Sequence, residues 1–155
     1  MANPVPDWKV IADALAAKLA TITDGAGAVI LRSATADVAD NLPPLPAAIV
    51  MPPAFTLDDN LSAEDYTARF TFVAPFEVTA GIERTITTIY AFVNAVVPAW
   101  RTGRLLGLNP LTTGITGSRV LSVAADEITE YDPPLPGVRG EIEVRVNVAV
   151  APRTA

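Results

Sequence analysis

The fold is decided by the stretch Glu141-Ile-Glu-Val-Arg-Val-Asn-Val-Ala-Val150, in which apolar and polar residues alternate. Successive side chains of a β-strand point to opposite faces, so the alternation sorts the stretch into two rows. The apolar row consists of β-branched residues: Ile142, Val144, Val146, Val148 and Val150. The polar row holds Glu141, Glu143, Arg145 and Asn147. We therefore expect a strand with one buried face and one polar face.

Further strands are expected upstream of this stretch. Alternation over residues 66–76 is equally clear and places Tyr66, Ala68, Phe70 and Phe72 on one face. Short apolar runs predict strands at residues 28–31, 47–51 and 119–125. The polar, acidic segment 55–65 is expected to be a loop, and residues 127–140 a long, proline-rich hairpin connection.

Two stretches carry the three-and-four spacing of amphipathic helices. In the first, Asp7 is placed to cap a helix that Gly25 and Gly27 end. Its apolar stripe is Trp8, Ile11, Leu15, Leu19 and Ile22. The second helix begins near Gly81, and Pro98 should end or kink it. Its apolar stripe is Ile82, Ile86, Ile89, Tyr90, Val93, Val96, Val97 and Trp100. Residues 101–109 are expected to add a further helical turn before a loop at 110–117.

The order of these elements predicts an α+β fold in two layers. Two main helices pack on one face of a mostly antiparallel sheet of about four to five strands. Residues 1–155 form a single domain in this interpretation, since that length is close to the commonest size of one domain. The other face of the sheet is expected to stay polar.

Composition narrows the classes of function. The chain lacks Cys and His, so it has no thiolate ligand and no imidazole to act as a general base or bind a metal. Its formal charge of -6 disfavours stable nucleic-acid binding, and the densest basic pair along the sequence is only Arg101 and Arg104. Neither a signal peptide nor a membrane span is expected, because residues 1–7 lack a basic start and the longest apolar run is short. We expect synthesis in a cytoplasm.

Two acidic clusters are candidates for chemistry. Asp58 and Asp59, with Glu64 nearby, could offer oxygen ligands to a hard cation, but they lack the glycine and spacing of an EF-hand, and a solvated loop is the simpler interpretation. A second cluster, which includes Glu127 and Asp132, could supply an acid-base pair, although turn residues beside it favour exposure to water. We therefore predict no catalytic, cofactor-binding or metal site, and expect the protein not to be an enzyme.

The polar row of the last strand has two interpretations. It is either a hydrated sheet face or a surface that contacts another subunit or lines a channel. The candidate interface or lumen residues are Glu141, Glu143, Arg145, Asn147, Asp58, Asp59, Tyr131 and Asp132. A high apolar content, 50% of residues, also favours surfaces that other subunits cover.

Four features in this order resemble the tail terminator (tail completion) proteins of long-tailed bacteriophages, the family of the lambda tail terminator. They are the helix at 8–22, the proline-bounded strand at 45–53, the long strand and helix at 66–100, and the final hairpin at 119–150. The resemblance implies a homohexameric ring at the head-tail junction of the virion. Such a ring caps the tail-tube protein, ends tail polymerisation, meets the head completion or connector protein and lets DNA pass in transit.

Other classes remain open. A head-completion protein or a tail-tube subunit belongs to the same assembly, although tube subunits usually rely on a two-sheet core. A small enzyme or ligand-binding domain that uses carboxylates is the alternative from a different class. It would need an apolar pocket that holds a carboxylate with a raised pKa.

Overall fold

The computed structural model describes residues 7–37, 43–57, 65–78 and 81–147. Three helices lie in this part of the chain: α1 (Trp8–Ala20), α2 (Ile82–Ala99) and the short α3 (Pro110–Thr113). The strands are β1 (Ser33–Thr35), β2 (Ala47–Val50), β3 (Ala54–Leu57), β4 (Asp65–Pro75), β5 (Ile115–Ile128) and β6 (Leu135–Asn147).

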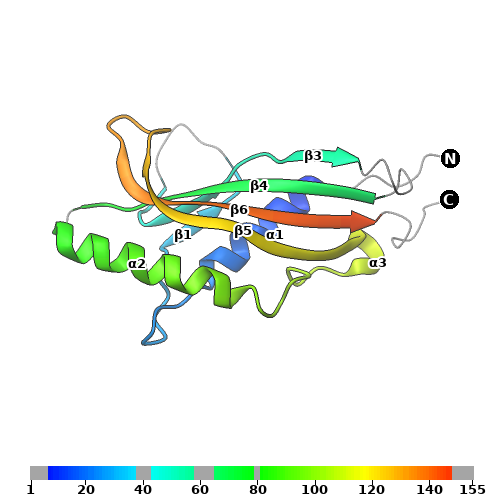
Figure 1. The fold of residues 1–155 in the computed structure, drawn as a ribbon, viewed down its shortest axis with the longest axis horizontal. Coiled ribbons are helices and arrows are strands. Elements are labelled where there is room, and N and C mark those ends of the chain that lie inside the picture. The colour runs from blue at the N-terminus through cyan, green and yellow to red at the C-terminus, as the bar shows by residue number, and fades with distance from the viewer. Residues whose placement is uncertain (1–6, 38–42, 58–64, 79–80, 148–155) are drawn as a thin grey trace.

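One mixed sheet holds all six strands in the order β1-β2-β4-β6-β5, with β3 pairing with β4 (Figure 1). β1 runs parallel to β2, and the other described pairs are antiparallel. The long strands β4 and β6 pair from Asp65↔Asn147 to Pro75↔Gly137. The α+β prediction is confirmed. The sheet has six strands rather than four to five, because β1 and β3 were not predicted, and β3 overlaps the segment expected to be a loop.

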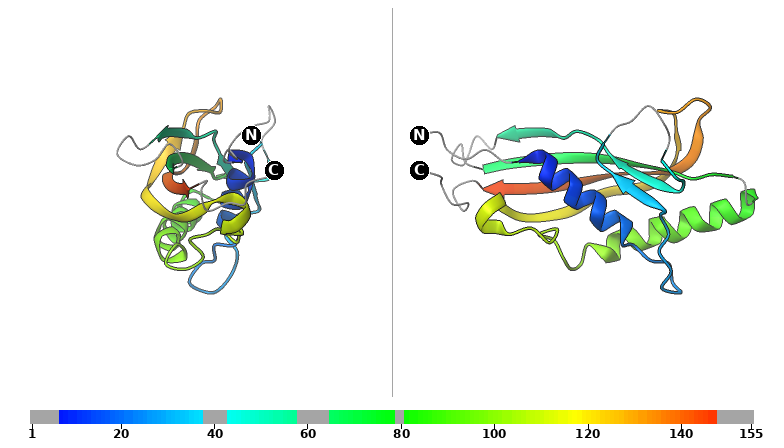
Figure 2. Two further views of the ribbon diagram at one scale, coloured as in Figure 1. Left: turned by 90° about the vertical axis from the view of Figure 1, so that its right-hand side faces the viewer. Right: turned by 180° about the vertical axis from the view of Figure 1, so that it is seen from behind.

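Both long helices lie on the same face of the sheet, as predicted (Figure 2). α1 packs against β1 and β2, and α2 packs against β5 and β6. One apolar cluster joins the two helices to the sheet. It includes Ile11, Leu15 and Leu19 of α1, Ile89, Phe92 and Val96 of α2, and Phe70, Phe72, Ile142, Val144 and Val146 of the central strands.

The first helix begins where predicted but ends early. The Asp7 carboxylate accepts a hydrogen bond from the Val10 amide at 3.2 Å and so caps α1. The helix ends at Ala20, and Thr21 bonds back to the Lys18 carbonyl at 2.7 Å, so the glycines at 25 and 27 fall in the following turn. The predicted strand at 28–31 is reduced to a single bridge between Thr23 and Val29.

The predicted apolar stripe of α2 is wrong in part. The buried side chains are Thr85, Ile89, Phe92 and Val96, with Trp100 at the C-cap. Ile82, Ile86, Tyr90 and Val97 are instead 66%, 47%, 60% and 50% exposed. The prediction merged two neighbouring stripes, one facing the core and one facing outward, because both are apolar and both repeat at three and four.

The C-terminal hairpin is longer than expected. β5 and β6 pair up to Ile128↔Leu135, so the connection spans only residues 129–134 rather than 127–140. Two glycines permit the close packing at the start of β6. A Cβ at Gly140 would meet the Phe72 ring, and one at Gly137 would meet the Ala74 carbonyl. The expected helical turn at 101–109 is absent from the described chain, and α3 forms instead at Pro110, capped by Asn109.

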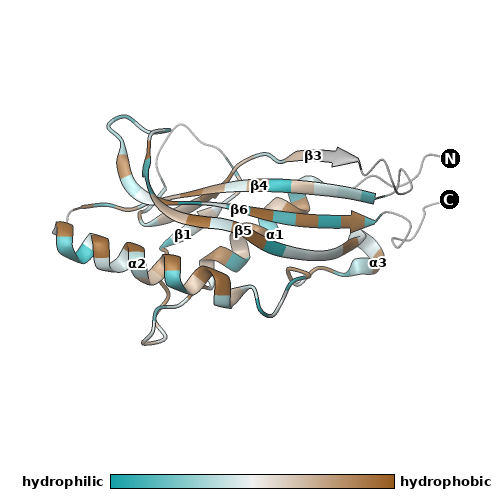
Figure 3. Cartoon of the chain, viewed as in Figure 1, coloured by the Kyte–Doolittle hydropathy of each residue, from teal (hydrophilic) through white to brown (hydrophobic). Residues whose placement is uncertain are grey.

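The second face of the sheet is polar over only part of its length. A small apolar cluster of Ala47, Ile49, Val73 and Ile128 is buried there. Leu45, Met51 and Tyr131 pack against it, so the hairpin connection contributes to its cover. Figure 3 shows hydrophilic residues concentrated toward the opposite end of β6. The expectation of a wholly polar face is therefore corrected.

Candidate functional site

At the polar row of β6, charged residues of three neighbouring strands lie side by side. Register places Glu143 of β6 between Arg69 of β4 and Arg119 of β5. Cross-strand neighbours of this kind have Cβ atoms about 5 Å apart. Glu143 is only 6% exposed, although alternation alone predicts that it faces water. A buried carboxylate requires partners, and arginines supply them.

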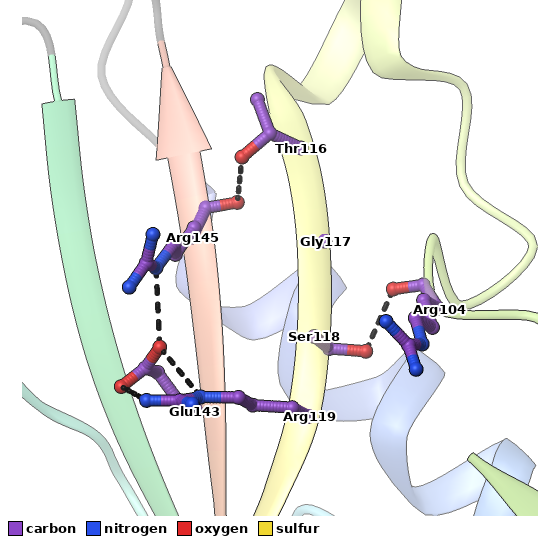
Figure 4. A pocket seen from close by; sticks show the side chains of 7 residues that line it. All are labelled: Arg104, Thr116, Gly117, Ser118, Arg119, Glu143 and Arg145. Atoms are coloured by element: carbon purple, nitrogen blue, oxygen red, sulfur yellow. Dashed lines mark hydrogen bonds and ion pairs between the residues drawn. The ribbon is translucent and has the colours of Figure 1, made fainter. Parts of the chain in front are cut away.

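Two arginines hold the Glu143 carboxylate (Figure 4). Arg119 donates from Nε to Oε1 at 3.2 Å and from a terminal nitrogen to Oε2 at 3.4 Å. Arg145 donates from Nε to Oε1 at 3.1 Å. The arginine side chains remain 62% and 65% exposed, so each guanidinium has one edge on the carboxylate and another toward solvent.

These contacts set the protonation state of Glu143. Burial alone would raise the pKa of this carboxyl group, but the hydrogen bonds from Arg119 and then Arg145 outweigh burial and lower the pKa below its usual value. Glu143 is therefore ionised at neutral pH. A general acid would need the opposite shift, so this carboxylate does not meet the requirement of the carboxylate-enzyme alternative.

Two β-bulges shape the strand beside this cluster. The register of β5 against β6 shifts between Ile115 and Gly117 and again between Val120 and Ser122. Bulges bend a strand and change the direction of its side chains. The segment between them borders a hollow of about 310 Å³. Its lining residues are Arg104, Thr116, Gly117, Ser118, Arg119, Glu143 and Arg145.

The remaining lining groups are fixed by hydrogen bonds. Ser118 accepts from the Trp100 indole at 3.1 Å and donates to the Arg104 carbonyl at 2.6 Å. Arg104 donates from Nε to the Trp100 carbonyl at 3.2 Å. Thr116 donates to the Arg145 carbonyl at 3.2 Å. A Cβ added to Gly117 would meet no atom within 4 Å, so the hollow is open above that residue.

The hollow is basic although the chain is acidic. Three guanidinium groups, those of Arg104, Arg119 and Arg145, line it with the single carboxylate of Glu143. The sequence offers Arg101 and Arg104 as its densest basic pair and does not show this grouping. The register of β6 with its two neighbours places Arg69 and Arg119 beside Glu143. Arg104 reaches the hollow from the segment between α2 and α3.

The predicted interface residues do not form one site. Glu143 and Arg145 contact each other, and Asn147 donates to Asp65 at 2.7 Å near the same end of the sheet. Glu141 is half-buried on the same row.

Tyr131 and Asp132 lie in the hairpin at the other end of β6, about 40 Å away for a strand of this length. Tyr131 packs on the second apolar cluster, whereas Asp132 is exposed. Asp58 and Asp59 lie outside the described residues.

An apolar groove lies between α2 and the C-terminal hairpin. Its volume is about 630 Å³. The outward stripe of α2 forms one wall through Ile82, Ile86 and Tyr90, and residues 125–127 and 134–137 form the other. The last residues of β5 therefore border a hydrophobic surface on the helix side of the sheet.

The fold and these surfaces define a two-layer α+β domain with a basic hollow and an apolar groove at opposite ends of β5. No protein-family model and no curated protein matches the chain. None of the described helices combines the length and apolar character needed to cross a bilayer.

Proposed function

We propose that this protein is a structural subunit of the tail terminator kind, which forms a ring at the head-tail junction of a long-tailed phage. The order of helices and strands supports the proposal because it matches the layout on which the family resemblance rests. The resemblance supplies the six-fold ring, the tail-tube and head-connector partners, and the passage of DNA through the lumen.

The observation that carries the proposal is the outward apolar stripe of α2 beside a strand edge that pairs with no other described strand. β5 is the last strand of the sheet, and its register is regular from Ser122 to Ile128. A long, regular edge strand invites pairing with another chain. The stripe of α2 exposes Ile82, Ile86 and Tyr90 next to this edge. In a monomer, the apolar stripe of α2 and the β5 edge would both remain exposed to water, which is unfavourable.

We assign this surface to a second copy of the chain. The opposite border of the sheet, formed by β1 and β3, differs from the β5 edge, so contact between the two borders is heterologous. Heterologous contacts repeat head to tail and close into a ring when the rotation per subunit suits closure. The ring uses both borders of every subunit and covers the regular part of the β5 edge, Ser122 to Ile128.

Electron microscopy of the virion tests the function directly. Labelled protein should mark a six-fold ring at the joint between head and tail. Absence of the protein from purified virions would refute the proposal. Incubation of the protein alone separates the alternatives within the same assembly, because a terminator stops at closed rings whereas a tail-tube subunit polymerises into long tubes.

The interface itself has a matched pair of variants. Tyr90→Glu places a charge on the outward stripe and should abolish ring formation on tail tubes without unfolding the subunit. Thr87→Glu introduces the same charge at another exposed position of α2 and should leave ring formation intact. If both variants assemble normally, the α2 stripe is not the contact surface.

A further inference from the structure

The hollow beside the bulged start of β5 has features that an assembly interface does not require. It gathers three arginines in a chain of net charge -6, and it contains a carboxylate that is almost fully buried. The proposed subunit contact uses the other, regular end of β5. The hollow therefore has no role in the ring contact described above.

We infer that this hollow binds a phosphate group of a DNA backbone. The assignment of DNA as the source of the phosphate rests on the proposed function, in which DNA passes through the lumen of the ring, and on the interpretation of the polar row of β6 as a channel lining. The oxyanion-binding chemistry rests only on the residues of the hollow.

Glu143 positions the arginines for this role. Its carboxylate takes the Nε edge of Arg145 and one edge of Arg119, so both side chains are held in place. The terminal nitrogens of Arg145 donate to no atom of the described chain and point away from Glu143 (Figure 4). A guanidinium offers five donors in a fixed fork, and the unused edge fits two oxygens of a phosphate.

Charge and space favour an oxyanion over a neutral ligand. Three arginines against one ionised glutamate leave a positive surplus at the hollow. Gly117 keeps the surface open where a side chain would otherwise project. Backbone phosphate contacts from arginine position nucleic acid without reading its sequence.

The expected affinity of one subunit is low. The chain as a whole is acidic and repels the duplex, so only the local field of the hollow favours contact. Weak contacts repeated around a ring would hold a passing duplex on axis while still allowing it to move, because each contact breaks easily.

The test compares Arg145→Gln with Arg84→Gln in the full chain. Both remove one exposed arginine, but Arg84 lies on α2 outside the hollow. Binding of a labelled short DNA duplex is followed by fluorescence anisotropy over a range of salt concentrations. Arg145→Gln should bind roughly tenfold more weakly, as expected for loss of a charged hydrogen-bonding group. Its salt slope should fall by about 0.9 per lost phosphate contact. Arg84→Gln should bind like the unmodified protein.

A second variant and a second ligand keep the test decisive. Arg104→Gln, on the other side of β5, should also weaken DNA binding, and circular dichroism checks that each variant is folded. Titration with inorganic phosphate should shift the NMR amide signals of Gly117 and Thr116.

Equal DNA affinity of Arg145→Gln and Arg84→Gln would overturn the site. Phosphate binding without any DNA binding would overturn DNA as the ligand. Sedimentation of the same samples measures ring formation separately, so failure of the proposed function is distinguishable.

Discussion

Replacement of Glu143 provides the sharpest test of the charged cluster. Alternation along β6 places this residue on the polar face, where Glu143→Lys should be harmless. The structure leads to the opposite expectation, because Glu143 is 6% exposed and bonded to Arg119 and Arg145. Glu143→Gln keeps the shape and removes only the charge, whereas Glu143→Lys adds a cation beside two others.

The size of the effect follows from the exposure of the partners. Each arginine side chain is more than 60% exposed, so each ion pair falls in the range for surface pairs, and the burial of the Glu143 carboxylate places it in the upper part, about 0.5–1 kcal/mol. Loss of both pairs in Glu143→Gln should lower the free energy of unfolding by about 1–2 kcal/mol. Like charges about 4 Å apart near a surface repel by about 4 kcal/mol. A lysine stem can swing partly away, so we expect a loss of about 3 kcal/mol for Glu143→Lys.

Urea unfolding at several pH values measures both effects. The folded-state pKa of Glu143 lies below its usual value, so its stabilisation is fully present above the unfolded pKa, about 4.3, and is lost as the pH falls through the folded pKa. The difference between wild type and Glu143→Gln should therefore be largest at pH 7 and shrink in acid. Glu141→Gln and Glu141→Lys are the matched controls on the same row, and each should change stability by less than about 0.5 kcal/mol. The reasoning is refuted if the two positions respond alike.

Three other substitutions test the packing. Gly140→Val should cost about 2–3 kcal/mol in urea unfolding, because its side chain would overlap the Phe72 ring, and Phe72→Leu in the same chain should restore part of the loss. Phe92→Ala should lower the free energy of unfolding by about 3–5 kcal/mol, since this side chain is fully buried. Tyr90→Ala, two residues away and 60% exposed, should lower it by less than about 1 kcal/mol. Equal losses would contradict the assignment of the two stripes. Asp7→Ala should lower stability by about 1 kcal/mol through loss of the α1 cap, and Asp7→Asn should retain most of it.

The sequence predicts the central strands and the first helix well because their patterns have one explanation. In β4 and β6, alternation identifies the face that meets the helices, and the buried positions Phe70, Phe72, Ile142 and Val144 are those predicted. In α1, one narrow apolar stripe follows a capping Asp7. Local patterns of this kind reflect burial directly.

The outward stripe of α2 and the arginine cluster could not be predicted in the same way. The eight residues of the predicted stripe cover more of the helix surface than a core needs, and the sequence does not reveal which of them meet the core or that Phe92 does. The cluster depends on strand register and on two bulges, which join residues as distant as Arg69 and Arg145. Both features belong to tertiary structure rather than to local periodicity.

The pairing of β4 with β6 has a consequence for synthesis. β4 is complete once residue 75 is made, yet its long partner begins only at Leu135. Until then Phe70 and Phe72 lack the neighbouring strand that helps to bury them. These core residues of a nascent chain therefore stay exposed while about 60 further residues are translated. Ribosome-bound chains halted before residue 135 should be cut readily by protease, whereas released chains should resist. If the protein forms the proposed ring, an unfinished subunit would lack the surface needed to join it.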